Sequence, residues 1–253
     1  MPYAELSTGV RLFYEDEGEG EPIILIHGWL GTARADLGGV LDWLSEDYHV
    51  IGPTMRGYGQ SRPPQRDYPI DHYQRDARDM LALMDALNIQ KAHIMGYSDG
   101  GEVALLAAGY APERFKSVAV WGAIGYYGPE MRPMIQRTYP PDYLSVEEIE
   151  RNGITNPDAY VLGWARAAIH LVDSGGDLSL SLAPNITCPL ILMLGTEDRL
   201  NPEAYGRKFV ENTPNGQFIM FECGHPIHNQ QTEQFKRVVG AFLEKVCNEN
   251  EKG

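Results

Sequence analysis

Short apolar runs alternate along the chain with longer stretches in which apolar residues recur at helical spacing. A run of about four to eight apolar residues between turn signals is typical of a strand buried on both faces of a sheet. Strands are therefore expected at 22–26, 48–52, 92–95, 115–121, 188–194 and 217–221. Two further strands, at 3–7 and 10–16, are expected to form an opening hairpin.

Helical periodicity falls between these runs. The stretch 71–87 places Ala77, Met80, Met84 and Leu87 on one face, as an amphipathic helix does. Further helices are expected at about 36–45, 102–108, 202–212 and 235–246. Strands that alternate with helices predict an α/β fold with a mostly parallel, eight-stranded sheet covered on both faces.

The alternation stops between about 122 and 184. Prolines interrupt the first part of this stretch, and Ser145 and Glu148 form a capping-box pattern for a short helix. Asn156-Pro157 is typical of the start of another helix. We therefore expect 124–184 to be an inserted helical lid (cap), and 1–123 and 185–253 to form the core.

The turn that follows the strand 92–95 carries a serine between glycines. Residues 96–101 read Gly-Tyr-Ser-Asp-Gly-Gly and precede an apolar helix, which is the strand–turn–helix context of a nucleophile elbow. Gly96 and Gly100 would give the turn the space that side chains would block. A short pattern is weak evidence alone, so a glycine-rich turn with a chance serine is the alternative at this point.

Acid and base candidates stand after later strands, in the order Ser98, Asp198, His225. The carboxyl ends of parallel strands meet at one edge of a sheet, so these side chains are expected to converge as a catalytic triad. Glu197 competes with Asp198 for the role of the acid, and Asp198 is favoured by its place in the turn. His225 directly follows Gly224 after the last strand and is favoured over His228, which is expected to pack beside the site.

A serine nucleophile also needs donors for the oxyanion that develops during acyl transfer. The first donor is expected to be the backbone N–H of Asp99, the residue after the serine. The second is expected from the glycine-containing loop His-Gly-Trp at 27–29, with the backbone N–H of Trp29 as the candidate.

Composition excludes several other classes of function. The net charge of −14 argues against a nucleic acid or an anionic membrane as a partner. Three cysteines without a Cys-x-x-Cys pattern indicate neither a disulfide framework nor a zinc site, and no metal or cofactor is expected. The acidic N-terminal stretch has no apolar segment typical of a secretory signal, so a cytoplasmic enzyme, monomeric or a small homo-oligomer, is expected.

The chain resembles the α/β-hydrolase superfamily over nearly its whole length. Within it, the sequence is most similar to the valacyclovir hydrolase (biphenyl hydrolase-like) group. The motifs that carry this resemblance are His-Gly-Trp at 27–29, Arg-Gly-Tyr-Gly-Gln-Ser-Arg-Pro-Pro at 56–64, Gly-Tyr-Ser-Asp-Gly-Gly at 96–101, Val-Trp-Gly-Ala at 120–123, the turn 195–198 and Gly-His at 224–225. The resemblance implies an α/β-hydrolase fold and hydrolysis of α-amino acid esters beneath a lid. The His-Gly of the oxyanion loop and the lid sequence depart from that group's pattern.

Asp99 is the position that bears on the substrate. In the group that the chain resembles, the acid after the nucleophile receives the substrate's α-amino group, so Asp99 is expected to bind an ammonium. The alternative is an acid that only stabilises the start of a helix. Aromatic residues Trp29, Tyr97, Trp121 and Trp164 are expected to line the substrate pocket.

These observations together predict a serine hydrolase that cleaves carboxylic esters through an acyl-enzyme. Its expected substrates are small-molecule α-amino acid esters of small alcohols or of prodrug-like leaving groups. The open alternatives are a general carboxylesterase, an aminopeptidase, a thiolactonase, a C–C bond hydrolase or a perhydrolase. A further alternative is a ligand receptor built on the hydrolase scaffold.

Overall fold

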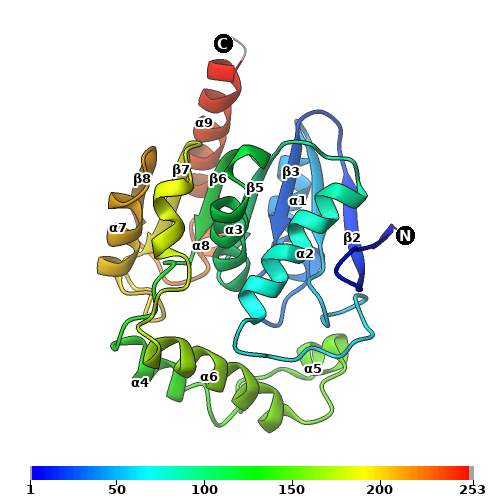
Figure 1. The fold of residues 1–253 in the computed structure, drawn as a ribbon, viewed down its shortest axis with the longest axis vertical. Helices are drawn as coiled ribbons and strands as arrows, with labels where there is room; N and C mark the ends of the chain where they lie inside the picture. Colours follow the sequence, from blue (N-terminus) through cyan, green and yellow to red (C-terminus); the bar gives the residue numbers. More distant parts are fainter. Residues whose placement is uncertain (1, 251–253) are drawn as a thin grey trace.

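Eight strands form a single sheet in the part of the chain that the computed structural model describes, residues 2–250 (Figure 1). Their order across the sheet is β1-β2-β4-β3-β5-β6-β7-β8. The strands are β1 (Tyr3–Glu5), β2 (Arg11–Glu17), β3 (Pro22–Ile26), β4 (His49–Pro53), β5 (Ala92–Tyr97), β6 (Phe115–Trp121), β7 (Leu190–Gly195) and β8 (Gly216–Phe221). The first two run antiparallel and β2 pairs antiparallel with β4, whereas the remaining pairs are parallel. The predicted mostly parallel, eight-stranded sheet is confirmed.

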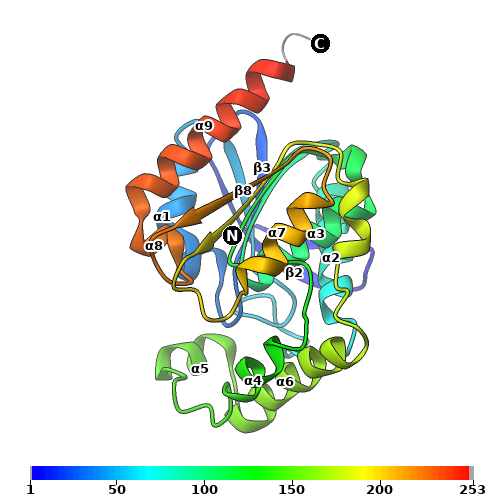
Figure 2. The ribbon, with the colours of Figure 1, turned by 90° about the vertical axis from the view of Figure 1, so that its left-hand side faces the viewer.

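Helices cover both faces of this sheet (Figures 1 and 2). One face carries α1, α8 and α9, and the other carries α2, α3 and α7. Their bounds are α1 (Ala33–Leu44), α2 (His72–Ala86), α3 (Asp99–Tyr110), α7 (Glu203–Glu211), α8 (Ile227–Gln230) and α9 (Thr232–Asn250), with a 3₁₀ turn η1 (Pro112–Arg114). Each face of the central strands therefore lies in its own apolar core, which explains why these strands read as continuous apolar runs.

The segment predicted as a lid contains helices α4 (Met131–Gln136), α5 (Val146–Asn152) and α6 (Pro157–Asp173), and ends in the 3₁₀ turn η2 (Leu180–Asn185). The three α-helices lie together beyond the sheet edge where the parallel strands end (Figures 1 and 2). In contrast, η2 packs on the core, because Leu182 lies against Gly109 of α3.

Local sequence signals explain where the inserted helices begin. Ser145 and Glu148 form the predicted capping box at the start of α5. The side chain of Asn156 accepts the backbone N–H of Ala159, and Pro157 occupies the first turn of α6. The insertion is held to the core by Asn152, whose side chain accepts the N–H of Gly59 and donates to the carbonyl of Leu30.

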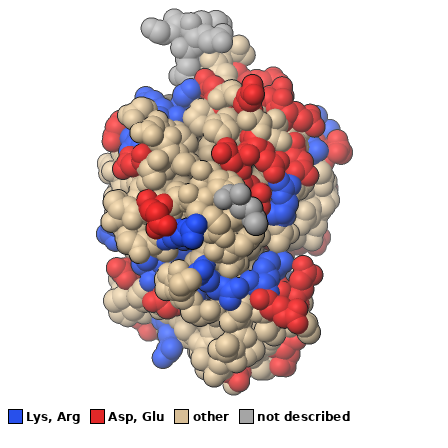
Figure 3. Space-filling view, turned by 90° about the vertical axis from the view of Figure 1, so that its right-hand side faces the viewer, with Lys and Arg blue, Asp and Glu red and all other residues tan. Residues whose placement is uncertain are grey.

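Charged side chains of both signs are interspersed on the face shown in Figure 3. Several carboxylates are paired with arginines, as Glu17 and Asp42 are with Arg34. Within residues 2–250, no helix has the length and apolar character needed to cross a membrane.

Candidate active site

The turn between β5 and α3 brings the backbone of two neighbouring elements into contact. A Cβ on Gly96 would overlap the carbonyl of Gly100, and a Cβ on Gly100 would overlap the carbonyl of Ile26. Ser98, between them, has φ 53° and ψ −122°, a conformation that a non-glycine residue adopts only under strain. Its N–H donates to the carbonyl of Trp121 at 2.9 Å. The strand, the helix and the neighbouring strand therefore hold the serine at the apex of the turn, as in a nucleophile elbow.

The structure brings together the three side chains that the sequence places after separate strands. Ser98 Oγ lies 3.0 Å from His225 Nε2, and His225 Nδ1 lies 2.8 Å from Asp198 Oδ2. Burial alone would raise the pKa of Asp198, but its hydrogen bonds with His225, Asn201 and Leu200 outweigh burial and lower it. The competing Glu197 is exposed. This hydrogen-bonded chain can move a proton from the serine hydroxyl to the imidazole.

Asn201 stabilises this hydrogen-bonded series and was not predicted from the sequence. Its side-chain amide donates to the carbonyl of Gly122 at 2.9 Å and to Asp198 Oδ2 at 3.0 Å. A Cβ on Gly122 would lie 2.7 Å from Cε1 of His225, so this glycine makes room for the imidazole. The signal in the sequence is weak, because an asparagine before a proline is common in turns.

The loop 27–29 lies beside the serine and is fixed by two side chains. Asp36 Oδ2 accepts the N–H of Gly28 at 2.8 Å. His27 Nε2 accepts the N–H of Met55 at 2.9 Å, so the ring proton is on Nδ1 and is donated to the Gly28 carbonyl. Burial lowers the pKa of His27 to about 3, which keeps the ring neutral.

The two expected oxyanion donors are free of other partners. In the hydrogen-bond network of residues 2–250, neither the backbone N–H of Trp29 nor that of Asp99 has an acceptor. The N–H of Asp99 is in the first turn of α3, where helical N–H groups have no partner within the helix. Trp29 follows Gly28, at which a Cβ would lie 3.3 Å from the Cβ of Ser98.

The side chain of Asp99 is a buried acid without a cationic partner among the described residues. Its Oδ1 accepts the hydroxyl of Tyr73 at 2.7 Å, and its Oδ2 accepts Nε1–H of Trp164 at 3.3 Å. Burial raises the pKa of Asp99 to about 6, despite these two hydrogen bonds and the more distant charge of Arg66. The carboxylate is therefore ionised at neutral pH and only partly compensated.

A small cavity of about 50 Å³ connects these groups. It is lined by Ser98, Asp99, Gly122, Tyr127, Met131, Met134, Ile135, Thr138, Trp164, Leu200, Asn201 and His225. The apolar side comes from the inserted helices α4 and α6, and the polar side comes from the core. Among the described residues, no trio of His, Cys, Asp and Glu spaced for a metal ion lies at this cavity.

The aromatic residues predicted for the pocket lie in different places. Trp164 lines the cavity, and Trp29 stacks on it with ring centroids 4.8 Å apart. Trp121 is fully buried on the opposite side of the sheet, where its Nε1–H donates to His228 Nδ1, so its expected place in the pocket is wrong. Tyr97 stacks on Trp121 behind His225 and does not line the cavity, which corrects that expectation too.

Comparisons with known proteins cover the sheet and the inserted helices. The family described as alpha/beta hydrolase fold matches residues 21–141. Serine hydrolase BPHL of Homo sapiens is 31% identical over 94% of this chain and 84% of its own length. The 2-hydroxymuconate semialdehyde hydrolase of Pseudomonas putida is 28% identical over 94% of this chain and 92% of its own. Among solved structures, a mutant of the meta-cleavage product hydrolase CumD from Pseudomonas fluorescens has a TM-score of 0.73 and 26% identity, covering 97% of this chain and 98% of its own.

Proposed function

The chain belongs to the α/β-hydrolase family and is a hydrolase. We propose that it cleaves carboxylic esters through an acyl-enzyme formed on Ser98. The observation that carries the proposal is the hydrogen-bonded series from Ser98 through His225 to Asp198, at a strained turn that faces a cavity. The Ser98 hydroxyl and its proton acceptor, His225 Nε2, are already close and oriented toward each other, so the hydroxyl can lose its proton as it attacks.

In the proposed acylation, the Ser98 hydroxyl oxygen attacks the ester carbonyl while His225 Nε2 takes its proton. Collapse of the tetrahedral intermediate breaks the bond to the alcohol, which leaves with that proton from the imidazole. Water then repeats the sequence on the acyl-enzyme and releases the acid. Asp198 holds the imidazole in the tautomer that carries its proton on Nδ1 and stabilises the charged ring.

The oxyanion of both intermediates would be bound by the backbone N–H groups of Trp29 and Asp99. The support for this assignment is that neither group has an acceptor among the described residues, that Asp99 follows the serine and that Gly28, next to Trp29, lies against it. The bond from Gly28 to Asp36 keeps the loop in place before the substrate arrives, so that no reorganisation is needed as charge develops.

Esters that carry an α-amino group fit this site best. The carboxylate of Asp99 lines the same cavity as Ser98 and, among the described residues, has two neutral donors but no cation in direct contact. A substrate ammonium would supply a positive charge in direct contact with this carboxylate. The same carboxylate would repel a substrate that places a carboxylate group there.

A second candidate is C–C bond hydrolysis, because one relative is named a 2-hydroxymuconate semialdehyde hydrolase and a similar structure is a meta-cleavage product hydrolase. The first name denotes a substrate with a carboxylate group. The buried, ionised Asp99 disfavours such an anion in this cavity, so this candidate ranks below the amino ester.

Two esters that differ only in the amino group test the proposal: the p-nitrophenyl esters of alanine and of propionic acid. We expect turnover of both, with kcat/KM at least about tenfold higher for the alanyl ester once the uncatalysed rates are subtracted. A fluorophosphonate probe should label one serine, identified as Ser98 by peptide mass spectrometry, and Ser98→Ala should remain unlabelled.

Each part of the proposal has its own contrary outcome. Label on another residue, or undiminished turnover in Ser98→Ala, would refute the nucleophile. A release of one equivalent of nitrophenol without further turnover would favour a ligand receptor over an esterase. Equal kcat/KM for the two esters would refute the preference for amino esters and leave a general carboxylesterase.

A further inference from the structure

A second group of chemically reactive side chains lies at the other end of β5. Glu21 precedes β3, His93 is in β5 and Cys247 is in α9, and one ligand atom of each lies within 4.8 Å of the other two. Glu21 Oε2 is 2.9 Å from His93 Nε2 and 3.6 Å from Cys247 Sγ. Three parts of the chain that are far apart in sequence thus present a carboxylate, an imidazole and a thiol to one point.

The spacing of these atoms is close to that of a metal site. Four ligands around Zn²⁺ at bond lengths of about 2.0–2.3 Å lie roughly 3.3–3.8 Å from one another. The distance of 3.6 Å between Glu21 and Cys247 falls in this range, and that of 2.9 Å between Glu21 and His93 is somewhat shorter. All three ligand atoms lie within 4.8 Å of one another. Nitrogen, sulfur and oxygen ligands in one set favour a borderline ion such as Zn²⁺ over Mg²⁺ or Ca²⁺.

His93 is oriented as a metal ligand is. Its ring is fully buried, and Nδ1 lies 2.7 Å from the hydroxyl of Ser117. In this structure Nε2–H donates to the carboxylate of Glu21, and Nδ1 accepts the hydroxyl of Ser117. A metal ion on Nε2 would move the ring proton to Nδ1, where the Ser117 oxygen can accept it. A second partner that fixes the tautomer in this way is the usual companion of a metal-bound histidine.

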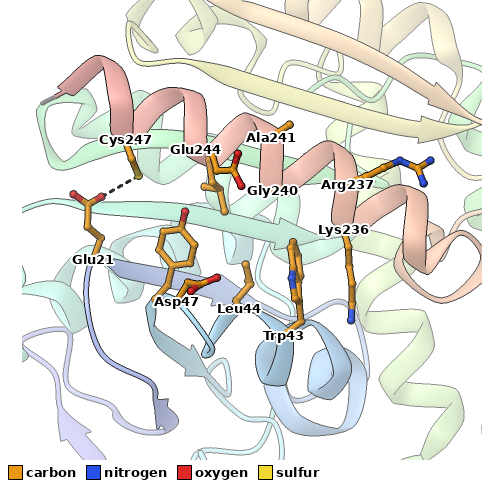
Figure 4. A pocket seen from close by; sticks show the side chains of 12 residues that line it. Glu21, Trp43, Leu44, Asp47, Lys236, Arg237, Gly240, Ala241, Glu244 and Cys247 are labelled. Carbon is orange, nitrogen blue, oxygen red and sulfur yellow. Dashed lines mark hydrogen bonds between the residues drawn. The ribbon is translucent and has the colours of Figure 1, made fainter. Parts of the chain in front are cut away.

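Access to the group is open. Glu21 and Cys247 line one end of a cavity of about 700 Å³ between α9 and α1, and Figure 4 shows them facing each other there. Trp43 and Lys236 line the other end of the same cavity (Figure 4). A metal ion can therefore enter from solvent and keep a water molecule as its fourth ligand.

We propose that Glu21, His93 and Cys247 bind a divalent transition-metal ion, with Zn²⁺ as the best match to the ligand set. Binding breaks the S–H bond of Cys247, forms a metal–thiolate bond and releases one proton to solvent. The ring proton of His93 shifts from Nε2 to Nδ1, where Ser117 Oγ accepts it, so that Nε2 and Glu21 Oε2 can both bind the ion. The ion would tie α9 to the amino-terminal end of the sheet and stabilise the fold, at the opposite end of β5 from Ser98.

Lys116 gives the proposal a signed test. Its ammonium lies 2.7 Å from Glu21 Oε1, on the oxygen that the metal would leave free. The ammonium of Lys116 and the divalent ion would repel each other. At a separation of several ångströms this repulsion changes a binding constant roughly tenfold even at the dielectric constant of water, so Lys116→Met should tighten metal binding by about that factor. A chance grouping of polar side chains would show no such gain.

Cobalt is the spectroscopic probe for this site, because a thiolate bound to Co²⁺ gives an intense charge-transfer band in the near ultraviolet. Full-length, tag-free reduced protein is titrated with Co²⁺ and then with Zn²⁺. We expect the band to saturate at one equivalent, Zn²⁺ to abolish it, and Zn²⁺ to raise the melting temperature without changing ester kcat/KM.

Matched variants decide whether the band comes from this site. Cys188→Ser alters another half-buried cysteine outside the group and should keep the band, whereas Cys247→Ser should lose it. Glu21→Gln removes the charge of one ligand and should weaken binding at least about tenfold. No saturable band, a band that survives Cys247→Ser, or unchanged or weaker binding in Lys116→Met would overturn the proposal, whatever the protein's activity on esters.

Discussion

Replacing Asp99 by asparagine should make the protein more stable and at the same time destroy its preference for amino esters. The side chain keeps its size, and the backbone N–H that is proposed to bind the oxyanion is unchanged. Asparagine removes only the negative charge, which in the free protein faces the hydroxyl of Tyr73 and the indole N–H of Trp164.

The size of the stability change follows from the pKa of Asp99. A rise from the ordinary 3.8 to about 6 corresponds to about 3 kcal/mol of unfavourable free energy in the ionised, folded state. Asparagine keeps one acceptor for Tyr73 but presents an amide to the N–H of Trp164, which forfeits about 1 kcal/mol. The net gain of about 2 kcal/mol should raise the melting temperature by roughly 4–8 °C.

The pH dependence of this gain has a fixed sign. Below pH about 3, Asp99 is protonated in both the folded and the unfolded chain, so the charge costs nothing and the variant gains nothing. Between the ordinary pKa of 3.8 and the folded-state pKa of about 6, only the unfolded chain is ionised, so the penalty on the wild type grows with pH and is complete above about 6. The variant's advantage should therefore be complete at pH 8 and absent near pH 3.

Activity should change in the opposite direction. Loss of one partner of a shielded ion pair costs about 3 kcal/mol or more, so kcat/KM for the alanyl ester should fall about 100-fold while that for the propionyl ester changes little. Glu102→Gln is the control, because Glu102 is a second buried acid of α3 that accepts the N–H groups of Ile124 and Gly125 away from the cavity. It should alter stability but not the ratio of the two activities. Equal losses on both esters in Asp99→Asn, or no gain in stability at pH 8, would refute the reasoning.

Three further predictions follow from the same site. Lowering the pH through about 6 should reduce the ratio of alanyl to propionyl kcat/KM, because protonation removes the charge of Asp99, and pH profiles of Asp99→Asn should show a flat ratio. Ser98→Gly should abolish fluorophosphonate labelling. It should also raise the melting temperature by several degrees, because glycine at φ 53° relieves about 1–3 kcal/mol of backbone strain. An unchanged melting temperature would contradict the strain. Asp36→Ala should lower kcat for the propionyl ester about tenfold with little change in KM, because the Gly28 N–H loses its acceptor and the loop 27–29 becomes less well fixed. A change confined to KM would count against this role.

The sequence was sufficient for the sheet, for the superfamily and for the side chains that meet at its edge. Parallel strands place their carboxyl ends together, so residues that directly follow strands, such as Ser98 and His225, converge whatever the lengths of the connections. Gly96 and Gly100 indicated the tight turn, because a Cβ at either position would overlap the backbone of a neighbouring segment. The family is confirmed by the similarity to known hydrolases.

The sequence could not show which face of a buried strand a residue occupies. Tyr97 and Trp121 are paired in register and both point to the core beneath α1 and α9, away from the cavity. Because both faces of a central strand are apolar, alternation carries no signal there, and an aromatic residue beside the elbow looks like a pocket residue. Asn201 and Asp36 were missed because their contacts depend on loop conformations that spacing does not encode.

The turn into α3 combines two unfavourable features that an ordinary helix start lacks. Ser98, just before the helix, has a strained backbone, and Asp99, its first residue, has a buried charge without a cation in contact, each worth a few kcal/mol. Both lie between central strands and buried helices, where relaxation would disrupt two apolar cores. The inserted helices, in contrast, supply the apolar side of the cavity from the outside of the core. It follows that substitutions in α4 and α6 should alter which acyl and alcohol groups fit, whereas the reaction itself depends on the rigid end of the sheet.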